Sequence, residues 1–295
     1  MEQKRNGKFK KIFVIAYSTA LIGFTTYAAL DTFVIPKAYT VVAQDEGVTE
    51  EITAVTANRY EDENIKIEIT EYETNDTTVY VADVTLSSAD YLQTAFAQNI
   101  FGRNIKAETS ETAAAHGAIL AINGDFYGSR NAGYVIRDGV LYRDTSAGNE
   151  GLALMADGSF SFYNEGDISA QQLLADGARE TWSFGPALLA DGTIQVSETE
   201  EVGKAKASNP RTAVGVIDDL HYVLVVSDGR TRASEGLSLY ELAAFLQGIG
   251  VQEAYNLDGG GSSTMVFNGV VVNNPTTGGS RINERSVSDI VYIGY

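Results

Sequence analysis

The chain has 295 residues, 44% of them hydrophobic, and a formal net charge of −18. A chain of this length and composition can bury a full hydrophobic core. So acidic a protein repels phosphate backbones, which excludes nucleic acid as a partner, and the absence of cysteine excludes disulfide frameworks and thiolate chemistry.

The chain begins with a basic segment followed by an apolar one. The run from Ile12 to Leu30 carries no charge, and as a helix rising about 1.5 Å per residue it would span roughly 28 Å, close to the hydrocarbon core of a bilayer. The basic residues that precede it are Lys4, Arg5, Lys8, Lys10 and Lys11. Because basic flanks stay in the cytoplasm, we expect a cytoplasmic tail over 1–11, a single-pass signal anchor over 12–30 in the cell membrane, and an extracellular domain.

The alternative for this segment is a cleaved signal peptide. The apolar region of a signal peptide normally runs about 7–15 residues, which is shorter than the run observed. Cleavage after Ala28 or Ala43 would release the rest of the chain from the membrane. The length of the run favours the anchor.

A linker is predicted between the apolar run and the folded domain. Residues 31–60 are expected to form a weakly structured stalk, because Pro36 interrupts them and the stretch 44–51 is acidic and polar. Residues 61–295 are expected to form one folded domain.

The domain sequence indicates mainly short strands. Apolar residues at 65, 67 and 69 alternate with charged ones and, with the turn at 75–76 and the strand 77–86, predict a hairpin. Hairpins are also predicted within 133–163, further strands at 117–122, 181–189, 213–217, 221–226, 251–257 and 288–293, and short helices at 89–98, 109–116 and 168–175. A capping box at Ser238 and Glu241 predicts one more helix. The pattern predicts an α+β domain built on a mixed β-sheet with few helices.

Three of the predicted strands end in polar residues next to glycine. Asn123 and Asp125 follow one strand, Asp228 and Arg230 follow another, and Asp258 follows a third. Rigid elements hold side chains in defined places. We therefore expect residues 123–125, 228–230, 256–263 and 284 to converge on one cleft.

The stretch from Asn256 to Ser263 forms the centre of the predicted site. Glycines at 259, 260 and 261 cost backbone entropy on folding, so three in a row indicate a turn or a close approach to a ligand. The N–H groups of such a turn can form an anion-binding nest. Arg211, which enters a buried strand from a loop containing proline, and Arg230 can bind phosphate through the planar guanidinium.

Five motifs in this order resemble the phosphodiester glycosidase family. They are Ile-Asn-Gly-Asp-Phe-Tyr at 122–127, Asn-Pro-Arg-Thr-Ala-Val-Gly at 209–215, Asp-Gly-Arg at 228–230, Asn-Leu-Asp-Gly-Gly-Gly-Ser-Ser-Thr-Met at 256–265 and Glu-Arg-Ser-Val at 284–287. The animal member of the family removes N-acetylglucosamine from a phosphodiester on mannose, and bacterial members are often labelled exopolysaccharide-biosynthesis proteins. The resemblance covers about residues 60–295.

The resemblance implies hydrolysis of a sugar-1-phosphodiester, here on glycans of the cell envelope or of exopolysaccharide. In such a reaction a carboxylate can stabilise or attack an oxocarbenium-like centre. Asp258 is the first candidate for this catalytic role, followed by Asp228, Asp125 and Glu284. The candidate substrate-binding residues are Asn123, Arg211, Arg230, Asn256, Gly259, Gly260, Gly261, Ser262 and Ser263.

Three alternatives remain open from the sequence. The domain could bind anionic polysaccharide without catalysis. Ser262 or Ser263 could be a nucleophile, although no histidine base is evident. No zinc-ligand spacing occurs and no cofactor is required, but Asp125, Asp228 and Asp258 could together hold a divalent cation such as Ca²⁺ or Mg²⁺. The oligomeric state is not predicted.

Overall fold

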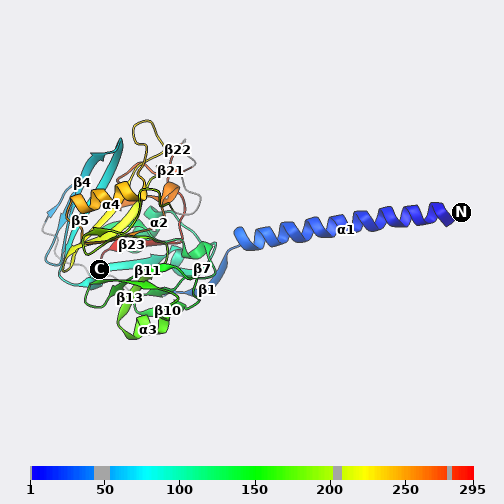
Figure 1. The fold of residues 1–295 in the computed structure, drawn as a ribbon, viewed down its shortest axis with the longest axis horizontal. Coiled ribbons are helices and arrows are strands. Elements are labelled where there is room, and N and C mark those ends of the chain that lie inside the picture. The colour runs from blue at the N-terminus through cyan, green and yellow to red at the C-terminus, as the bar shows by residue number, and fades with distance from the viewer. Residues whose placement is uncertain (1, 43–53, 202–207, 278–280) are drawn as a thin grey trace.

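The fold is seen in a computed structural model, which describes residues 2–42, 54–201, 208–277 and 281–295 (Figure 1). Helix α1 (Glu2–Phe33) projects from a domain rich in β-strands. The shorter helices α2 (Thr109–Ala115), α3 (Ala170–Ala175) and α4 (Leu239–Gly248) belong to the domain. The predicted fold class, a sheet domain with few helices behind one N-terminal apolar helix, is confirmed.

Helix α1 is longer than the predicted span of 12–30 at both ends. Its most apolar part, Phe13–Phe33, has 21 residues and is not buried against the domain. By length and composition this part can cross a membrane. A signal sequence near an N-terminus would have the same length and composition.

Two antiparallel sheets pack face to face and enclose the main core. The larger sheet has nine strands in the order β15-β14-β18-β16-β17-β5-β4-β3-β2, and the smaller has five in the order β20-β19-β8-β23-β6. The strands of the larger sheet are β2 (Ala54–Val55), β3 (Arg59–Glu61), β4 (Ile65–Thr74), β5 (Thr77–Leu86), β14 (Ala187–Ala190), β15 (Thr193–Ile194), β16 (Thr212–Asp218), β17 (His221–Ser227) and β18 (Glu253–Asn256). Those of the smaller sheet are β6 (Leu92–Phe96), β8 (Leu120–Asn123), β19 (Met265–Phe267), β20 (Val270–Val271) and β23 (Asp289–Ile293).

Smaller sheets lie at the edges of this pair. A three-stranded sheet consists of β11 (Glu150–Met155), β12 (Phe160–Asn164) and β13 (Ala178–Trp182). Two-stranded pairs are formed by β1 (Lys37–Val41) with β7 (Ile100–Arg103), β9 (Val135–Arg137) with β10 (Val140–Arg143), and β21 (Thr276–Thr277) with β22 (Arg281–Ile282). Single 3₁₀ turns occur at η1 (Ala89–Tyr91), η2 (Ala97–Asn99), η3 (Tyr127–Ser129) and η4 (Gly260–Ser262).

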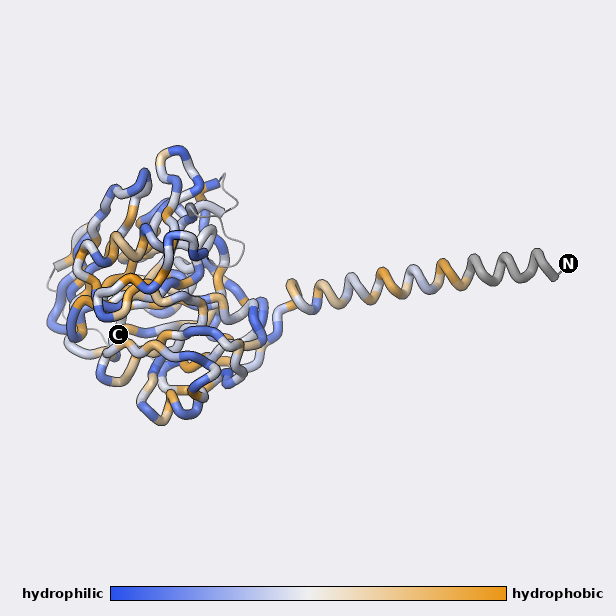
Figure 2. Tube along the Cα trace, in the orientation of Figure 1, coloured by the Kyte–Doolittle hydropathy of each residue, from blue (hydrophilic) through white to orange (hydrophobic). Residues whose placement is uncertain are grey.

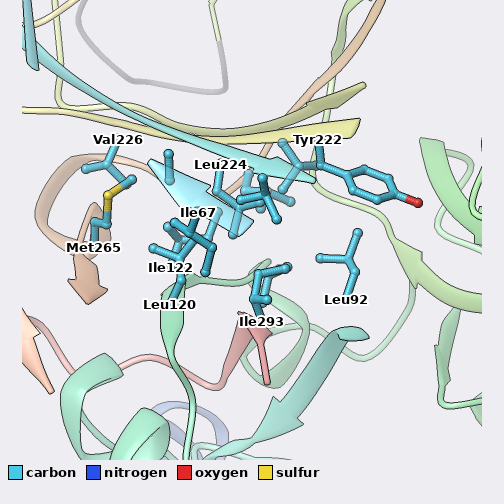
Figure 3. Close-up of a cluster of buried hydrophobic side chains, with 14 of the residues drawn as sticks. Ile67, Leu92, Leu120, Ile122, Tyr222, Leu224, Val226, Met265 and Ile293 are labelled. Atoms are coloured by element: carbon cyan, nitrogen blue, oxygen red, sulfur yellow. The ribbon is translucent and has the colours of Figure 1, made fainter. Parts of the chain in front are cut away.

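The strand sequences explain why the two sheets pack together. Ile67 and Leu224 of the larger sheet meet Leu120, Ile122 and Ile293 of the smaller one in a single buried cluster (Figure 3). Because side chains alternate across a strand, the other residues of β17 point the opposite way. That second face of the larger sheet is buried by α4.

Helices cover the outer faces of both sheets. The inward side of α4 carries Leu239, Leu242 and Leu246, which belong to one buried cluster with Val223 and Val225 of β17. On the smaller sheet, Ala113 of α2 belongs to a separate cluster with residues of β8, β19 and β23. The resulting order is helix, sheet, sheet, helix, and it leaves the strand ends as the places where polar loops gather.

The first predicted hairpin and the capped helix are confirmed. Strands β4 and β5 pair in register from Ile65 opposite Leu86 to the turn, where Asn75 and Asp76 adopt positive φ angles of 47° and 51°. At α4, the Ser238 hydroxyl accepts a hydrogen bond from the N–H of Glu241 and the Glu241 carboxylate accepts one from the N–H of Ser238.

Residues 31–60 were predicted to form a weakly structured stalk. Where the structure shows strands in this segment, that prediction is corrected. β1 pairs with β7, and β2 and β3 extend the edge of the larger sheet. Gly102 permits the first pairing, because a Cβ there would lie 2.0 Å from the carbonyl oxygen of Lys37. The acidic stretch 44–51 and the cleavage position at Ala43 lie outside the described residues.

Two further predictions are corrected. Residues 89–98 contain strand β6 between two 3₁₀ turns instead of a helix, because main-chain pairing with β23 outweighs a weak local preference. The strand predicted at 181–189 is divided into β13 and β14, which belong to different sheets.

Candidate active site

A cleft of about 320 Å³ lies where the loops after β8, β17 and β18 meet. Six of the predicted site residues line it: Arg211, Arg230, Asn256, Asp258, Gly259 and Gly260. The other lining residues, which were not among the candidate site residues, are Phe126, Arg130, Phe184, Asn209, Leu257 and Arg285. This volume is in the range of small-molecule sites in proteins.

Close packing of the loop after β18 requires its glycines. A Cβ at Gly259 would lie 2.8 Å from the carbonyl oxygen of Pro210, and one at Gly260, where φ is +65°, would lie 2.6 Å from Nη2 of Arg230. The N–H groups of Gly260, Ser262 and Ser263 donate to main-chain carbonyls. These three groups are therefore not available to the anion-binding nest that the sequence predicted.

Asp258 places its carboxylate at the wall of the cleft. The side chain is 14% exposed, and its Oδ2 accepts a hydrogen bond of 2.6 Å from the Ser262 hydroxyl and one of 3.2 Å from Nη2 of Arg285. Burial raises the pKa of Asp258 above its usual range, although Arg285 and Ser262 act to lower it. The carboxylate is thus held in one orientation by two donors while one face meets the cleft.

Arg211, Arg230 and Arg285 line the cleft together with Asp258. Arg230 is exposed, and its Nε and Nη2 donate to Oδ1 of Asn209 at 3.2 and 3.0 Å. Partial burial of the guanidinium, followed by the neighbouring charges of Arg285 and Arg211, lowers the pKa of Arg230. Positive charge is therefore concentrated at this end of the cleft in a protein that is strongly acidic overall.

Arg211 is more firmly held than the other two arginines. Its side chain is buried, its Nε donates to the carbonyl of Leu237 at 2.7 Å, and its Nη2 forms an ion pair of 2.7 Å with Glu201. Glu201 therefore competes with any anion that approaches Arg211.

Aromatic rings and a further arginine form another part of the cleft. The guanidinium of Arg130 lies 5.8 Å from the ring centre of Phe126 and 5.3 Å from that of Phe184, distances at which a cation is attracted to an aromatic ring. Its Nη1 donates to the carbonyl of Ser183 at 2.9 Å. The aromatic rings supply an apolar surface of the kind that packs against sugar rings.

Asn256 is a lining residue of the same cleft. Its side chain is 1% exposed, and its Nδ2 donates to the carbonyl of Gly185 at 2.8 Å. Within the described part of the chain its Oδ1 has no hydrogen-bond partner. A buried acceptor of this kind is costly unless a ligand satisfies it.

Four predicted substrate-binding residues lie behind the cleft surface. Asn123 is fully buried, accepts a hydrogen bond from Thr212 and donates one of 2.6 Å to the carbonyl of Asp258. Ser263 accepts from Thr212 at 3.1 Å, Ser262 donates to Asp258, and Gly261 packs against Thr277. These residues shape the loop that carries Asp258.

The other three predicted catalytic carboxylates do not line the cleft. Asp125 is buried and accepts hydrogen bonds from the N–H groups of Tyr127 and Ser183. Asp228 is buried and accepts from the N–H and Nδ2 of Asn274, each at 2.8 Å. Of the four predicted carboxylates, only Asp258 is therefore among the described residues that line the cleft.

Glu284 lies at the start of α2. Its carboxylate accepts hydrogen bonds from the N–H of Ser110 at 3.0 Å and from the Ser110 hydroxyl at 2.6 Å. A carboxylate at a helix N-terminus satisfies donors that the helix leaves open. Its position is explained by this helix contact.

The structure does not bring the candidate metal ligands together. Among the residues that it describes, no three His, Asp or Glu side chains are placed to hold one ion. Asp125, Asp228 and Asp258 therefore do not form the shared cation site considered from the sequence.

A buried network of charged side chains lies next to the cleft. Arg137 Nη2 is 2.8 Å from Oδ2 of Asp289 and 3.9 Å from Oδ1 of Asp125. Burial acts to lower the pKa of Arg137, but the carboxylates of Asp289 and Asp125 outweigh it and raise this pKa. Burial raises the pKa of Glu180, a further member, to about 7.

Gly124 connects this buried network to the cleft. A Cβ at Gly124 would lie 2.5 Å from Oδ1 of Asp289, and the carbonyl of Gly124 accepts a hydrogen bond of 3.4 Å from the N–H of Asp258. The glycine in the Asn-Gly-Asp stretch is thus required by the packing of β8 on β23. Arg137, Glu180 and Asp289 lie outside the five motifs, so local sequence patterns did not single them out.

The fold resembles that of known proteins. Over 84% of this chain and 89% of the other, it matches the catalytic domain of zebrafish N-acetylglucosamine-1-phosphodiester alpha-N-acetylglucosaminidase, auto-inhibited by its pro-peptide, with a TM-score of 0.64 and 23% identity. A hypothetical protein from Synechocystis matches over 78% of this chain and 62% of its own, with a TM-score of 0.59 and 17% identity. At these identities the likeness concerns the fold.

Sequence relatives include an uncharacterized protein of the SPbeta prophage of Bacillus subtilis (strain 168), 32% identical over 60% of this chain and 28% of its own length. The mouse N-acetylglucosamine-1-phosphodiester alpha-N-acetylglucosaminidase is 31% identical over 58% of this chain and 36% of its own length. The chain therefore matches about a third of the length of these relatives. The family profile described as phosphodiester glycosidase matches residues 116–294, which is more than half of the chain. The chain belongs to the phosphodiester glycosidase family.

Proposed function

We propose that the protein hydrolyses a sugar-1-phosphodiester in the cleft around Asp258. The observation that carries the proposal is the pairing of one cleft-facing carboxylate with a cluster of arginines. A sugar-1-phosphodiester has a matching charge pattern, since the anomeric carbon becomes positive in the transition state next to an anionic phosphate. The family of the chain supports a substrate of this class.

The reaction breaks the bond between the anomeric carbon and the phosphate oxygen. The leaving phosphate monoester keeps the electron pair, and water supplies the hydroxyl of the released sugar. Asp258 stabilises or attacks the oxocarbenium-like carbon, and Arg230 and Arg285 stabilise the charge that grows on the phosphate. Since the departing group is an anion held by arginines, charge stabilisation contributes more than protonation.

Two further cleft residues are assigned to binding. The Oδ1 of Asn256, which has no partner among the described residues, accepts a hydrogen bond from a hydroxyl or amide N–H of the sugar. Phe126 and Phe184 pack against the sugar or its acceptor. Arg211 contributes to phosphate binding when the Glu201 carboxylate is displaced from it.

The substrates proposed are glycans of the cell envelope or of exopolysaccharide. We infer that α1 is retained as a single-pass anchor in the cell membrane and that the catalytic domain is extracellular. The length of the apolar segment supports this topology. Recovery of a mature chain that begins after Ala28 or Ala43 would instead identify a cleaved signal peptide.

The function is tested by measuring free sugar released from a panel of sugar-1-phosphodiesters, N-acetylglucosamine-1-phosphodiesters among them, by the full chain in detergent. Release by the native protein and its loss in Asp258→Asn are expected. Asp219→Asn, at an exposed carboxylate, is the matched control and should behave as the native protein does. Tight binding of the panel without release by any of the three proteins would identify a glycan-binding module instead.

A further inference from the structure

The end of helix α1 is fastened to the folded domain by side chains of the segment after β7. Arg103 Nη2 donates to the carbonyl of Thr32 at 2.9 Å, and Asn104 Nδ2 donates to the carbonyl of Ile35 at 3.1 Å. The last carbonyls of a helix have no partner within the helix. Here Arg103 of the domain donates a hydrogen bond to one of these carbonyls, that of Thr32.

The chain after the helix continues directly into a strand of the domain. β1 pairs with β7 from Lys37 opposite Arg103 to Val41 opposite Ile100. The ring of Tyr39 lies 5.8 Å from that of Phe101, and Lys37 forms an ion pair of 2.7 Å with Asp31 at the end of α1. Only a few residues separate α1 from β1, so helix and domain are joined without a long free linker.

Large apolar side chains are exposed at this junction. Phe33 is 76% exposed, Val34 60%, Ile35 40%, Tyr39 58% and Val41 73%. We call these five residues the collar. Elsewhere in the described domain, exposed large apolar residues occur singly, at Val55, Tyr72, Val140, Val270 and Ile282. Single exposed apolar residues are ordinary, whereas a contiguous group marks an interaction surface.

We propose that the collar is embedded in the interfacial layer of the lipid bilayer and holds the catalytic domain on the membrane in a fixed orientation. The collar begins at Phe33, where the apolar part of α1 ends, and Figure 2 shows orange segments recurring along that helix. Aromatic residues such as Phe33 and Tyr39 are enriched at the boundary between hydrocarbon and water. Lys37 lies among them, and its long side chain can reach the headgroups while its stem stays in the apolar layer. The proposal rests on the retention of α1 as an anchor.

Strand β7, which pairs with β1, connects the collar to the cleft. β7 contacts η3, since the rings of Phe101 and Tyr127 stack at 5.6 Å and the N–H of Asn104 donates to the carbonyl of Gly128 at 3.0 Å. Phe126, the residue before η3, lines the cleft. A domain held by its collar therefore keeps this wall of the cleft near the bilayer surface, where membrane-attached glycans are found.

The absence of cysteine from the chain allows the collar to be tested with single labels. Val41→Cys carries a spin label on the collar, and Val270→Cys, at a valine of similar exposure in β20, is the matched control. The full chain is placed in phosphatidylethanolamine–phosphatidylglycerol vesicles. Relaxation by oxygen, which concentrates in the apolar layer, is then compared with relaxation by a water-soluble nickel chelate.

The expected result is a ratio of oxygen to nickel accessibility severalfold higher at position 41 than at position 270. Equal ratios would overturn the proposal, and so would a label at position 41 that is shielded from both reagents, which would indicate cover by protein. An intact mass lacking α1 would overturn the anchor on which the proposal rests. None of these readings needs turnover, so they stand apart from failure of the proposed glycosidase activity.

The fixed orientation is tested by the distance between two labels. Phe33→Cys and Val270→Cys in one chain report the position of the helix end relative to the domain. A narrow distance distribution is expected, and it should broaden when Arg103→Ala and Asn104→Ala are added. A distribution that is already broad before these two changes would show that the domain is not held.

Discussion

The cleft and the buried network next to it combine arginines and carboxylates in opposite surroundings. In the cleft, Asp258 is paired with an arginine whose side chain is 42% exposed, and Arg230 has no carboxylate partner among the described residues. In the network, Arg137 and Asp289 are 4% and 0% exposed and 2.8 Å apart. The difference indicates that buried charges are committed to each other, whereas the cleft retains charge that a ligand can neutralise.

The largest effect is expected from breaking the buried network. Arg137→Met should lower the free energy of unfolding by about 3–5 kcal/mol, because it leaves Asp289 and Asp125 as buried carboxylates without their cation. Thermal and denaturant melts measure this loss. Adding Asp289→Asn should recover part of it, and an unchanged melting temperature in the single variant would contradict the role given to Arg137.

In contrast to Arg137→Met, Asp258→Asn is expected to lower turnover and to leave the fold intact. A hundredfold or greater fall in kcat, roughly 3 kcal/mol, is expected if the carboxylate acts on a developing cation. Because burial already raises the pKa of Asp258, the neutral amide should cost no stability. Steady-state kinetics with melts as control measure both effects, and a well-folded variant with native kcat would remove Asp258 from the mechanism.

Glu180→Gln tests the buried network through the pH dependence of stability. The pKa of Glu180 in the folded protein is raised to about 7, so the folded state holds a proton that the unfolded state releases at lower pH. The native protein should therefore lose stability as the pH rises through 7, by about 1.4 kcal/mol for each unit of the pKa difference. The glutamine variant should lack this component in melts between pH 5 and pH 8, and parallel curves for the two proteins would argue against it.

Arg230→Ala should have the smallest effect, because the side chain is exposed. Loss of a charged hydrogen bond to phosphate should raise KM roughly tenfold, with little change in stability. Arg232→Ala, two residues away and also exposed, is the matched control. If both variants raise KM equally, the effect comes from general charge and not from the cleft.

The predictions from local signals were the successful ones. The β4–β5 hairpin, the cap of α4 and the strand leading to Asp258 each depend on residues close together in the chain, so the sequence displays them directly. The sequence could not place Asp228 and Glu284 relative to the cleft, because an Asp-Gly step or a lone glutamate has the same sequence whether it faces a cleft or binds a nearby donor. Their actual partners, Asn274 and Ser110, are far away in the chain.

Composition and local pattern by themselves determined the apolar N-terminal helix, the sheet-rich domain and the position of Asp258 at the end of a strand. Only the tertiary structure decided that Arg130, Phe184 and Arg285 join Asp258 in one cleft, and that Arg137 and Asp289 form a pair. The physical reason is that burial and charge pairing depend on which distant strands lie side by side. Packing of the two sheets sets that arrangement, and no single segment of the chain records it.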